Sequence, residues 1–179
     1  MRHINPNDIR NGDTLLVDRK GIVPDAIHFF QGNRYNHAAI FIWVGGKLYV
    51  FEAIKQGQAF TLFEEYMKQF KTGDIDIMIL RPKTKKDIDF QEFFDFIAPL
   101  THKPYGLVNL LIYQPVKFIG KWFGKDWWIG GDDNTRNFIC GELVAYIYNH
   151  FLGWFKDWYK IAPVALFNST NLKHYYIKK

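Results

Sequence analysis

Two runs of apolar and β-branched residues lie on either side of a Gly-Gly pair in the first third of the chain. The runs cover residues 37–44 and 47–54, and the glycines occupy positions 45 and 46. Both central positions of a type I′ turn need a positive φ angle, which glycine adopts readily. The pattern therefore predicts a two-residue β-hairpin, and in this register Ala39 pairs with Glu52.

Other segments have the periodicity of strands or of amphipathic helices. Isoleucine at alternate positions from Ile75 to Ile79 predicts a half-buried strand. Apolar residues at helical spacing from Phe90 to Leu100 predict a helix with one buried face, capped by Asp87. The remaining predicted elements are a short helix at 23–30, a helix that a capping-box pattern opens at Thr61–Glu64 and Gly73 closes, a helix from about Phe138 to Phe151 that Gly153 ends, and a strand from Leu172 to Ile177.

Together these elements predict an α+β fold, in which an antiparallel sheet or half-barrel is packed by helices. The chain has 179 residues, the usual size of one domain, so we expect a single domain over residues 1–179. Aromatic residues make up 18% of the chain, which predicts aromatic packing in the core and in any groove. The chain has one cysteine, which excludes an internal disulfide.

The formal net charge of +5 favours anionic partners. Basic residues gather near Lys83 and at the end of the chain, while acidic residues are interspersed elsewhere, so we expect no nucleic-acid partner. The positive field can assist encounter with an anionic wall or membrane surface, without defining a site. The first residues lack an apolar signal region, and no run of about 18 uncharged apolar residues occurs. The default expectation is a cytoplasmic protein without a membrane span; removal of a signal would make it an exported one.

The single cysteine, Cys140, lies where a polar loop turns into an apolar-periodic stretch. In the first turn of a helix, unpaired backbone N–H groups favour a thiolate over a thiol. Cys140 is therefore a candidate nucleophile. A lone cysteine in a core is more often a small apolar residue, so this interpretation depends on a partner elsewhere in the chain.

His37, in the predicted hairpin, is the candidate partner of Cys140, and Glu52 on the second strand is the candidate partner of His37. In the register given above, their side chains are diagonal neighbours on one face, with backbones about 7–8 Å apart. A carboxylate and an imidazole can close that gap to a hydrogen bond, so Glu52 can orient His37. An odd loop length would place Glu52 on the opposite face from His37. Glu52 would then be an ordinary solvent-facing residue of an alternating strand. A nucleophile, a base and an orienting carboxylate are the groups of a cysteine hydrolase.

The order of these residues resembles the circularly permuted papain-like cysteine hydrolases, the YiiX-like relatives of the NlpC cell-wall peptidases. The resemblance covers most of the chain and is carried by the segments Asn11–Val17, Tyr35–Ile40, Lys103–Gly106, Phe138–Leu143 and Ala162–Leu166. It implies a permuted papain-like fold of the NlpC type, with Cys140 as nucleophile, His37 as its base and Glu52 holding the imidazole. Gly141 departs from the serine or other small residue that the family often has after the cysteine.

The resemblance also implies that Tyr105, upstream of the nucleophile, lines the site and helps to stabilise the oxyanion. An equal alternative is that Tyr105 is simply one of ten tyrosines in an aromatic-rich chain. Trp127, Trp128 and Tyr35 are candidate substrate-binding residues. The aromatic segment 107–131 either completes the core or lines a groove for an acyl chain or a peptide beside the nucleophile.

The sequence thus predicts a cysteine hydrolase or acyltransferase that acts on an amide or ester bond through a Cys-His-Glu triad and a thioester. The resemblance suggests cell-wall peptides or lipid acyl groups as substrates, and no cofactor. The alternative is a catalytically silent papain-like binding module at a wall or membrane surface. A metal site is not expected, because the chain has one cysteine and its histidines lack paired ligand spacing.

Overall fold

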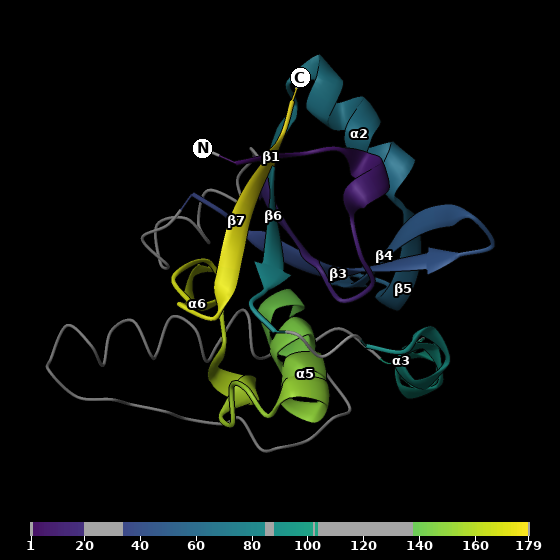
Figure 1. Ribbon diagram of the computed structural model, residues 1–179, viewed down its shortest axis with the longest axis vertical. Coiled ribbons are helices and arrows are strands. Elements are labelled where there is room, and N and C mark those ends of the chain that lie inside the picture. The colour runs from purple at the N-terminus through teal and green to yellow at the C-terminus, as the bar shows by residue number, and fades with distance from the viewer. Residues whose placement is uncertain (1, 20–33, 85–87, 102, 104–137, 179) are drawn as a thin grey trace, which may run out of the picture.

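The computed structural model describes residues 2–19, 34–84, 88–101, 103 and 138–178. Its strands are β1 (His3–Ile4), β2 (Thr14–Arg19), β3 (His37–Val44), β4 (Lys47–Ile54), β5 (Gly57–Leu62), β6 (Ile75–Pro82) and β7 (Leu172–Ile177). Its helices are α2 (Phe63–Thr72), α3 (Phe90–Ile97), α5 (Cys140–Leu152) and α6 (Pro163–Phe167), with short 3-10 helices at Pro6–Asp8, Ala98–Leu100 and Trp158–Lys160. The fold is mixed α+β, as the sequence predicted (Figure 1).

The predicted hairpin is present as β3 and β4, in the predicted register. Gly45 and Gly46 have φ angles of 56° and 74°, the positive values that a two-residue turn requires. Ala39 lies opposite Glu52 across the two strands. Since alternate side chains of a strand share a face, His37 lies on the face of Glu52.

The strands form one sheet in the order β1-β7-β6-β2-β3-β4-β5. The β1–β7 pair is parallel, and every other neighbouring pair in this sheet is antiparallel. The prediction of an antiparallel sheet is therefore confirmed except at this edge. There the first strand lies beside the last one, and the N–H of Tyr176 donates to the carbonyl of Arg2 at 3.0 Å.

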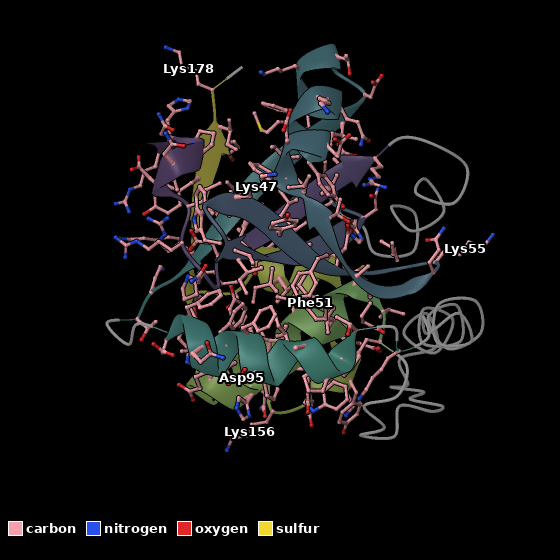
Figure 2. The ribbon with its side chains drawn as sticks, turned by 90° about the vertical axis from the view of Figure 1, so that its right-hand side faces the viewer. Lys47, Phe51, Lys55, Asp95, Lys156 and Lys178 are labelled. Carbon is pink, nitrogen blue, oxygen red and sulfur yellow. The ribbon has the colours of Figure 1, made fainter. Side chains whose placement is uncertain are left out.

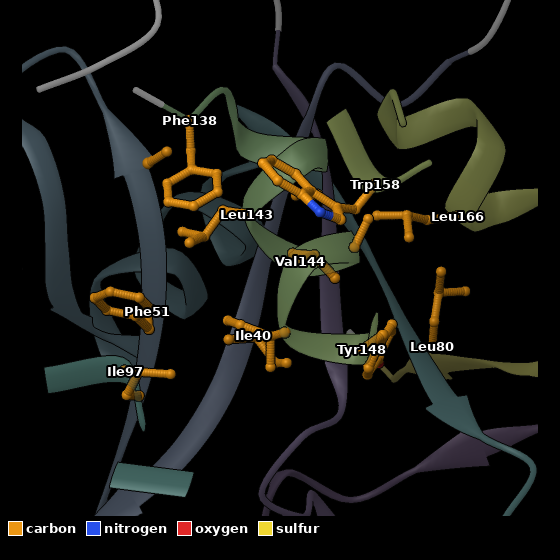
Figure 3. Close-up of a cluster of buried hydrophobic side chains, with 14 of the residues drawn as sticks. Ile40, Phe51, Leu80, Ile97, Phe138, Leu143, Val144, Tyr148, Trp158 and Leu166 are labelled. Carbon is orange, nitrogen blue, oxygen red and sulfur yellow. The ribbon is translucent and has the colours of Figure 1, made fainter. Parts of the chain in front are cut away.

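Both faces of the sheet are buried, each under a different set of helices. On one face the strands pack against α2, whose Phe63, Tyr66 and Phe70 are buried. On the other face, Ile40 and Phe51 belong to the core cluster that includes residues of α3, α5 and α6 (Figure 3). Figures 1 and 2 both show α2 on one side of the sheet and α3 and α5 on the other. Two buried faces explain why the two strands of the hairpin are nearly continuous apolar runs.

The ends of α2 show one prediction confirmed and one wrong. Gly73 ends the helix with a φ angle of 86°, and its N–H donates to the last carbonyl groups of the helix. The predicted capping box at Thr61 is wrong, because Thr61 lies in β5 and Leu62 occupies the N-cap without a side-chain hydrogen bond. The chain passes directly from strand to helix here, so the helix begins at a buried phenylalanine, Phe63.

Helix α3 is present over much of the predicted range. Asp89 caps it and accepts the N–H groups of Gln91 and Glu92. The predicted cap, Asp87, is therefore wrong, because Asp89 occupies the N-cap position. The predicted helix at 23–30 and the aromatic segment 107–131 lie outside the described residues. In the described part of the chain, no helix combines the length and the apolar character needed to cross a bilayer.

Candidate active site

Helix α5 begins at Cys140, two residues later than the sequence predicted. Phe138 and Ile139, which precede it, are buried and hold the start of the helix against the core. The side chain of Ile139 has no acceptor, so the cap comes from Glu142, whose carboxylate accepts the N–H of Ile139 at 3.1 Å. These contacts fix Cys140 in the first turn of the helix.

Gly141 lets a distant segment approach the start of α5. A Cβ atom at this position would lie 2.6 Å from the carbonyl oxygen of Ile161 and 2.9 Å from the carbonyl carbon of Ala162. Both are backbone atoms that come just before Pro163, the first residue of α6. This close approach explains a glycine at a position where it lowers helix propensity.

The start of β3 lies beside the thiol. Cys140 Sγ is 4.0 Å from the backbone oxygen of Asn36. The side chain of Asn36 donates to the carbonyl of Arg19 at 2.7 Å and accepts its N–H at 3.2 Å. The N–H of Asn36 donates to the carbonyl of Val17 at 3.0 Å. This anchoring on β2 sets the position of the next residue, His37.

The hydrogen bond predicted across the hairpin is present. His37 Nε2 and Glu52 Oε2 lie 2.6 Å apart. The Cys140 side chain lies close enough to the imidazole to raise the pKa of His37. Because Glu52 engages Nε2, Nδ1 is the ring nitrogen that remains for the sulfur. The structure therefore brings Cys140, His37 and Glu52 together, and we refer to these three residues as the triad.

Glu52 has further donors that the sequence did not reveal. The hydroxyl of Tyr66 donates to Glu52 Oε2 at 2.6 Å, and the side chain of Thr61 helps to lower the pKa of the same carboxyl. Glu52 is only 2% exposed, so these donors replace water around the carboxylate. The available signal was a tyrosine between Phe63 and Phe70 on the apolar face of α2, because a buried tyrosine hydroxyl usually has a partner.

The charges of His37 and Glu52 stabilise each other. Burial lowers the pKa of His37, but hydrogen bonds and charge interactions with Cys140 and Glu52 outweigh it and raise the pKa from 6.5 to about 9. Burial raises the pKa of Glu52, but the hydrogen bond and charge of His37, with the hydroxyls of Thr61 and Tyr66, lower it from 4.5 to about 2. Burial and the charge of Glu52 raise the pKa of Tyr66, which therefore remains a hydroxyl donor.

Of the other predicted site residues, the structure describes Tyr35 only. Tyr35 is buried, and its ring packs against Phe167 with centroids 5.5 Å apart. Its described contacts are those of a core residue, and substrate binding by Tyr35 stays a prediction. Tyr105, Trp127 and Trp128 lie outside the described residues, so their roles also stay predictions.

Among the residues that the structure describes, no three His, Cys, Asp or Glu side chains are grouped so that they could hold a metal ion. In the triad, His37 Nε2 and Glu52 Oε2 are bonded to each other and are not directed at a shared point. This donor set does not fit a metal centre.

No protein-family model matches the chain, and no curated protein matches it either. Among solved structures, the chain is similar to YiiX from Escherichia coli O157:H7, described as a metalloprotein of DUF1105, with a TM-score of 0.65 and 15% sequence identity. The similarity covers 92% of this chain and 95% of the YiiX chain. The chain therefore has a YiiX-like fold, in which a mixed sheet with helices on both faces places Cys140 beside His37.

Proposed function

We propose that the protein is a cysteine hydrolase or acyltransferase of the permuted papain-like type, which acts on an amide or ester bond. The observation that carries the proposal is the 2.6 Å hydrogen bond between Glu52 and His37, beside a thiol at the start of α5. This arrangement has the order of a nucleophile, a base and an orienting carboxylate. The fold supports the YiiX-like part of the family resemblance, and the relationship to the NlpC peptidases is part of the proposal.

The protonation of the triad favours an anionic nucleophile. With a pKa of about 9, His37 is protonated at neutral pH, and with a pKa of about 2, Glu52 is charged. An imidazolium beside the sulfur stabilises a thiolate. In the proposed mechanism, His37 holds the proton that Cys140 gives up, and Glu52 balances the charge of the ring.

In the proposed reaction, the sulfur of Cys140 attacks the carbonyl carbon of the substrate, and the π electrons of the carbonyl move to its oxygen. Backbone N–H groups in the first turn of α5 have no partner within the helix, and they donate to this oxyanion. When the tetrahedral intermediate collapses, His37 Nδ1 gives its proton to the leaving amine or alcohol, and a thioester remains. Water or another acceptor then loses a proton to His37 as it attacks the thioester and frees Cys140.

The proposed substrates are peptide amides of the bacterial cell wall or acyl groups of lipids. Tyr105 is proposed as a further oxyanion donor, and Trp127 and Trp128 as the lining of the substrate groove. Alanine at either tryptophan should then weaken turnover of substrates with a long acyl chain or peptide more than turnover of a small ester.

Alkylation by iodoacetamide at pH 6 tests the nucleophile directly. An ordinary thiol is almost fully protonated at this pH and reacts slowly, whereas a thiolate paired with an imidazolium reacts fast. We expect the folded protein to react at least about tenfold faster than His37→Ala and than the unfolded chain. Because the sequence has a single cysteine, total labelling reports on Cys140 alone.

Turnover distinguishes an enzyme from a silent binding module. Cys140→Ala should abolish hydrolysis of activated esters and of cell-wall peptides, with unchanged circular dichroism. Hydrolysis that survives in this variant would remove Cys140 from the mechanism. Fast alkylation of the native protein without turnover of any acyl substrate would favour the binding module.

A further inference from the structure

His37 has a charged neighbour on each side in the sheet. On β4, Glu52 pairs with Ala39, which follows His37 by two residues. On β2, His37 pairs with Val17, which precedes Arg19 by two residues. Arg19 and Glu52 therefore both occupy positions diagonal to His37 on its own face, where backbones are about 7–8 Å apart. The register places a guanidinium on the opposite side of the imidazole from the carboxylate.

Contacts with Asn36, just before β3, and with Tyr66 of α2 hold Arg19 in this position. Its backbone is bonded to the side chain of Asn36, at 3.2 Å through the N–H and at 2.7 Å through the carbonyl. The backbone oxygen of the same Asn36 lies beside Cys140 Sγ. The guanidinium carbon of Arg19 lies 5.2 Å from the centre of the Tyr66 ring, and stacking on a ring restricts a guanidinium.

Within the described part of the chain, Arg19 has no carboxylate partner. Its Nε atom is buried and has no hydrogen-bond partner among the described residues. Arg34, near the same end of β2, differs, because its Nε pairs with Asp18 at 2.8 Å. The Glu52 carboxylate is already bonded to the imidazole and to the Tyr66 hydroxyl. A half-buried guanidinium without a counter-charge is costly, and an anionic ligand would relieve that cost.

We propose that Arg19 binds an anionic group of the acyl substrate, a carboxylate or a phosphate, next to the carbonyl that Cys140 attacks. This inference rests on the proposed function and narrows its substrates to acyl compounds with a negative charge close to the reacting bond. A planar guanidinium presents paired N–H donors that match the oxygens of either anion. An acidic peptide would supply a carboxylate, and a phospholipid would supply a phosphate.

Two alkylating reagents that differ in charge test this site. Iodoacetate carries a carboxylate where iodoacetamide carries a neutral amide, and in both cases the sulfur of Cys140 displaces iodide. We expect the ratio of the iodoacetate to the iodoacetamide rate constant to fall about tenfold in Arg19→Gln. Arg34→Gln is the matched control, because Arg34 is 57% exposed and paired with Asp18; its ratio should equal that of the native protein.

The ratio separates this inference from the proposed function. Slow reaction of the native protein with both reagents would count against the nucleophile, while the ratio would still report on the anion. Fast reactions with an unchanged ratio in Arg19→Gln would overturn the anion site and leave the nucleophile intact. Equal slowing with both reagents would make Arg19 a positioning residue that acts through Tyr66, and would also overturn the anion site.

Protection of the native protein against iodoacetamide identifies the anion. We expect N-acetylalanine, which carries a carboxylate, or glycerol 3-phosphate to slow the alkylation of Cys140. Protection by the first alone assigns a carboxylate, and protection by the second alone assigns a phosphate. Protection by neither compound, or equal protection of Arg19→Gln, would overturn the site.

Discussion

Glu52 is the residue on which the candidate site depends most. It is a buried carboxylate that accepts from Tyr66 and pairs with His37, in both cases at 2.6 Å. A buried charge is tolerated when such donors replace its lost hydration. The hydroxyl of Tyr66 therefore acts on the imidazole through Glu52, and this role can be tested without touching the triad.

We expect Tyr66→Phe to slow the alkylation of Cys140 at pH 7 by about three- to tenfold, because the carboxylate loses a donor that fixes it against His37. Tyr148→Phe is the matched control. Tyr148 is also fully buried (Figure 3). Its hydroxyl forms hydrogen bonds with the Thr14 hydroxyl at 2.7 Å and with the carbonyl of Gly12 at 2.8 Å.

Both variants should lose about 1–2 kcal/mol of unfolding free energy in urea, since each leaves buried partners of a hydroxyl without it. The alkylation rate should change in Tyr66→Phe alone. Equal rates in the two variants would show that Tyr66 contributes to stability and not to the positioning of His37.

The His37–Glu52 pair also predicts how stability depends on pH. His37 has a folded pKa of about 9 against 6.5 for the free side chain, so its contribution is complete below pH 6.5 and is lost as the pH rises through 9. Glu52 has a folded pKa of about 2 against 4.5, so its contribution is complete above pH 4.5 and is lost as the pH falls through 2. Between pH 4.5 and 6.5 the pair stabilises the fold most.

The measurement is the difference in unfolding free energy between the native protein and the double variant His37→Ala with Glu52→Gln, taken across pH. We expect this difference to be larger by about 3 kcal/mol near pH 5.5 than above pH 9. A difference in unfolding free energy that stays constant from about pH 5 to about pH 10 would contradict a charged pair, because this range brackets the titration of His37.

At the scale of elements, the sequence predicted the features that depend on nearby residues alone, namely the hairpin turn and the ends of two helices. The hairpin was predictable to the residue, because Gly45 and Gly46 leave one favoured loop length and the loop fixes the register. The C-terminal stops of α2 and α5 were predictable for the same reason, since Gly73 and Gly153 adopt the left-handed conformation.

Strand β5 (Gly57–Leu62) was not predicted, because the segment is short and its apolar and polar residues do not alternate regularly. Its pairing with β4 determines its structure, and that pairing converts the apparent capping box at Thr61 into strand. Thr61 then helps to lower the pKa of Glu52 instead of capping a helix. Tertiary pairing overrides a local signal here.

Replacing Gly141 by alanine tests the close approach of the Ile161–Ala162 segment to helix α5. Alanine raises helix propensity, by up to about 1 kcal/mol in a helix interior, but its Cβ would lie 2.6 Å from the carbonyl oxygen of Ile161. Because that atom is backbone, the segment before α6 must shift. We expect Gly141→Ala to lower the unfolding free energy by about 1–3 kcal/mol in a urea titration. An unchanged or raised value would show that the Ile161–Ala162 segment moves aside without cost.

At the scale of the whole molecule, the candidate site depends on contacts that no local pattern specifies. Cys140 and Asn36 lie beside each other although they are 104 positions apart. The family resemblance connected Cys140 to His37, but nothing in the sequence connected Tyr66 or Arg19 to them. Those two residues join the site because α2 covers the face of the sheet to which His37 belongs, and because β2 pairs with β3 beside His37.

The same sheet gathers positive charge at another place, which we call the basic surface: Arg10, Arg81, Lys83 and Lys173. These residues line one pocket together with Pro82, Thr84 and Tyr175. Arg81 lies directly opposite Lys173 on β6 and β7, an arrangement of like charges that is unfavourable on its own. Asp13 pairs with Arg81 at 2.7 Å and so balances one of these charges.

We expect the basic surface to associate with anionic membranes. Vesicles that contain phosphatidylglycerol should sediment the protein at low salt, vesicles of phosphatidylcholine alone should not, and salt should release it. Each basic residue near such a surface contributes about 1 kcal/mol, so Lys83→Glu with Lys173→Glu should weaken binding at least about tenfold. Lys55→Glu with Lys156→Glu changes the net charge equally at exposed positions elsewhere (Figure 2). If this control weakens vesicle binding as much as Lys83→Glu with Lys173→Glu does, binding depends on the net charge of the protein and not on the basic surface.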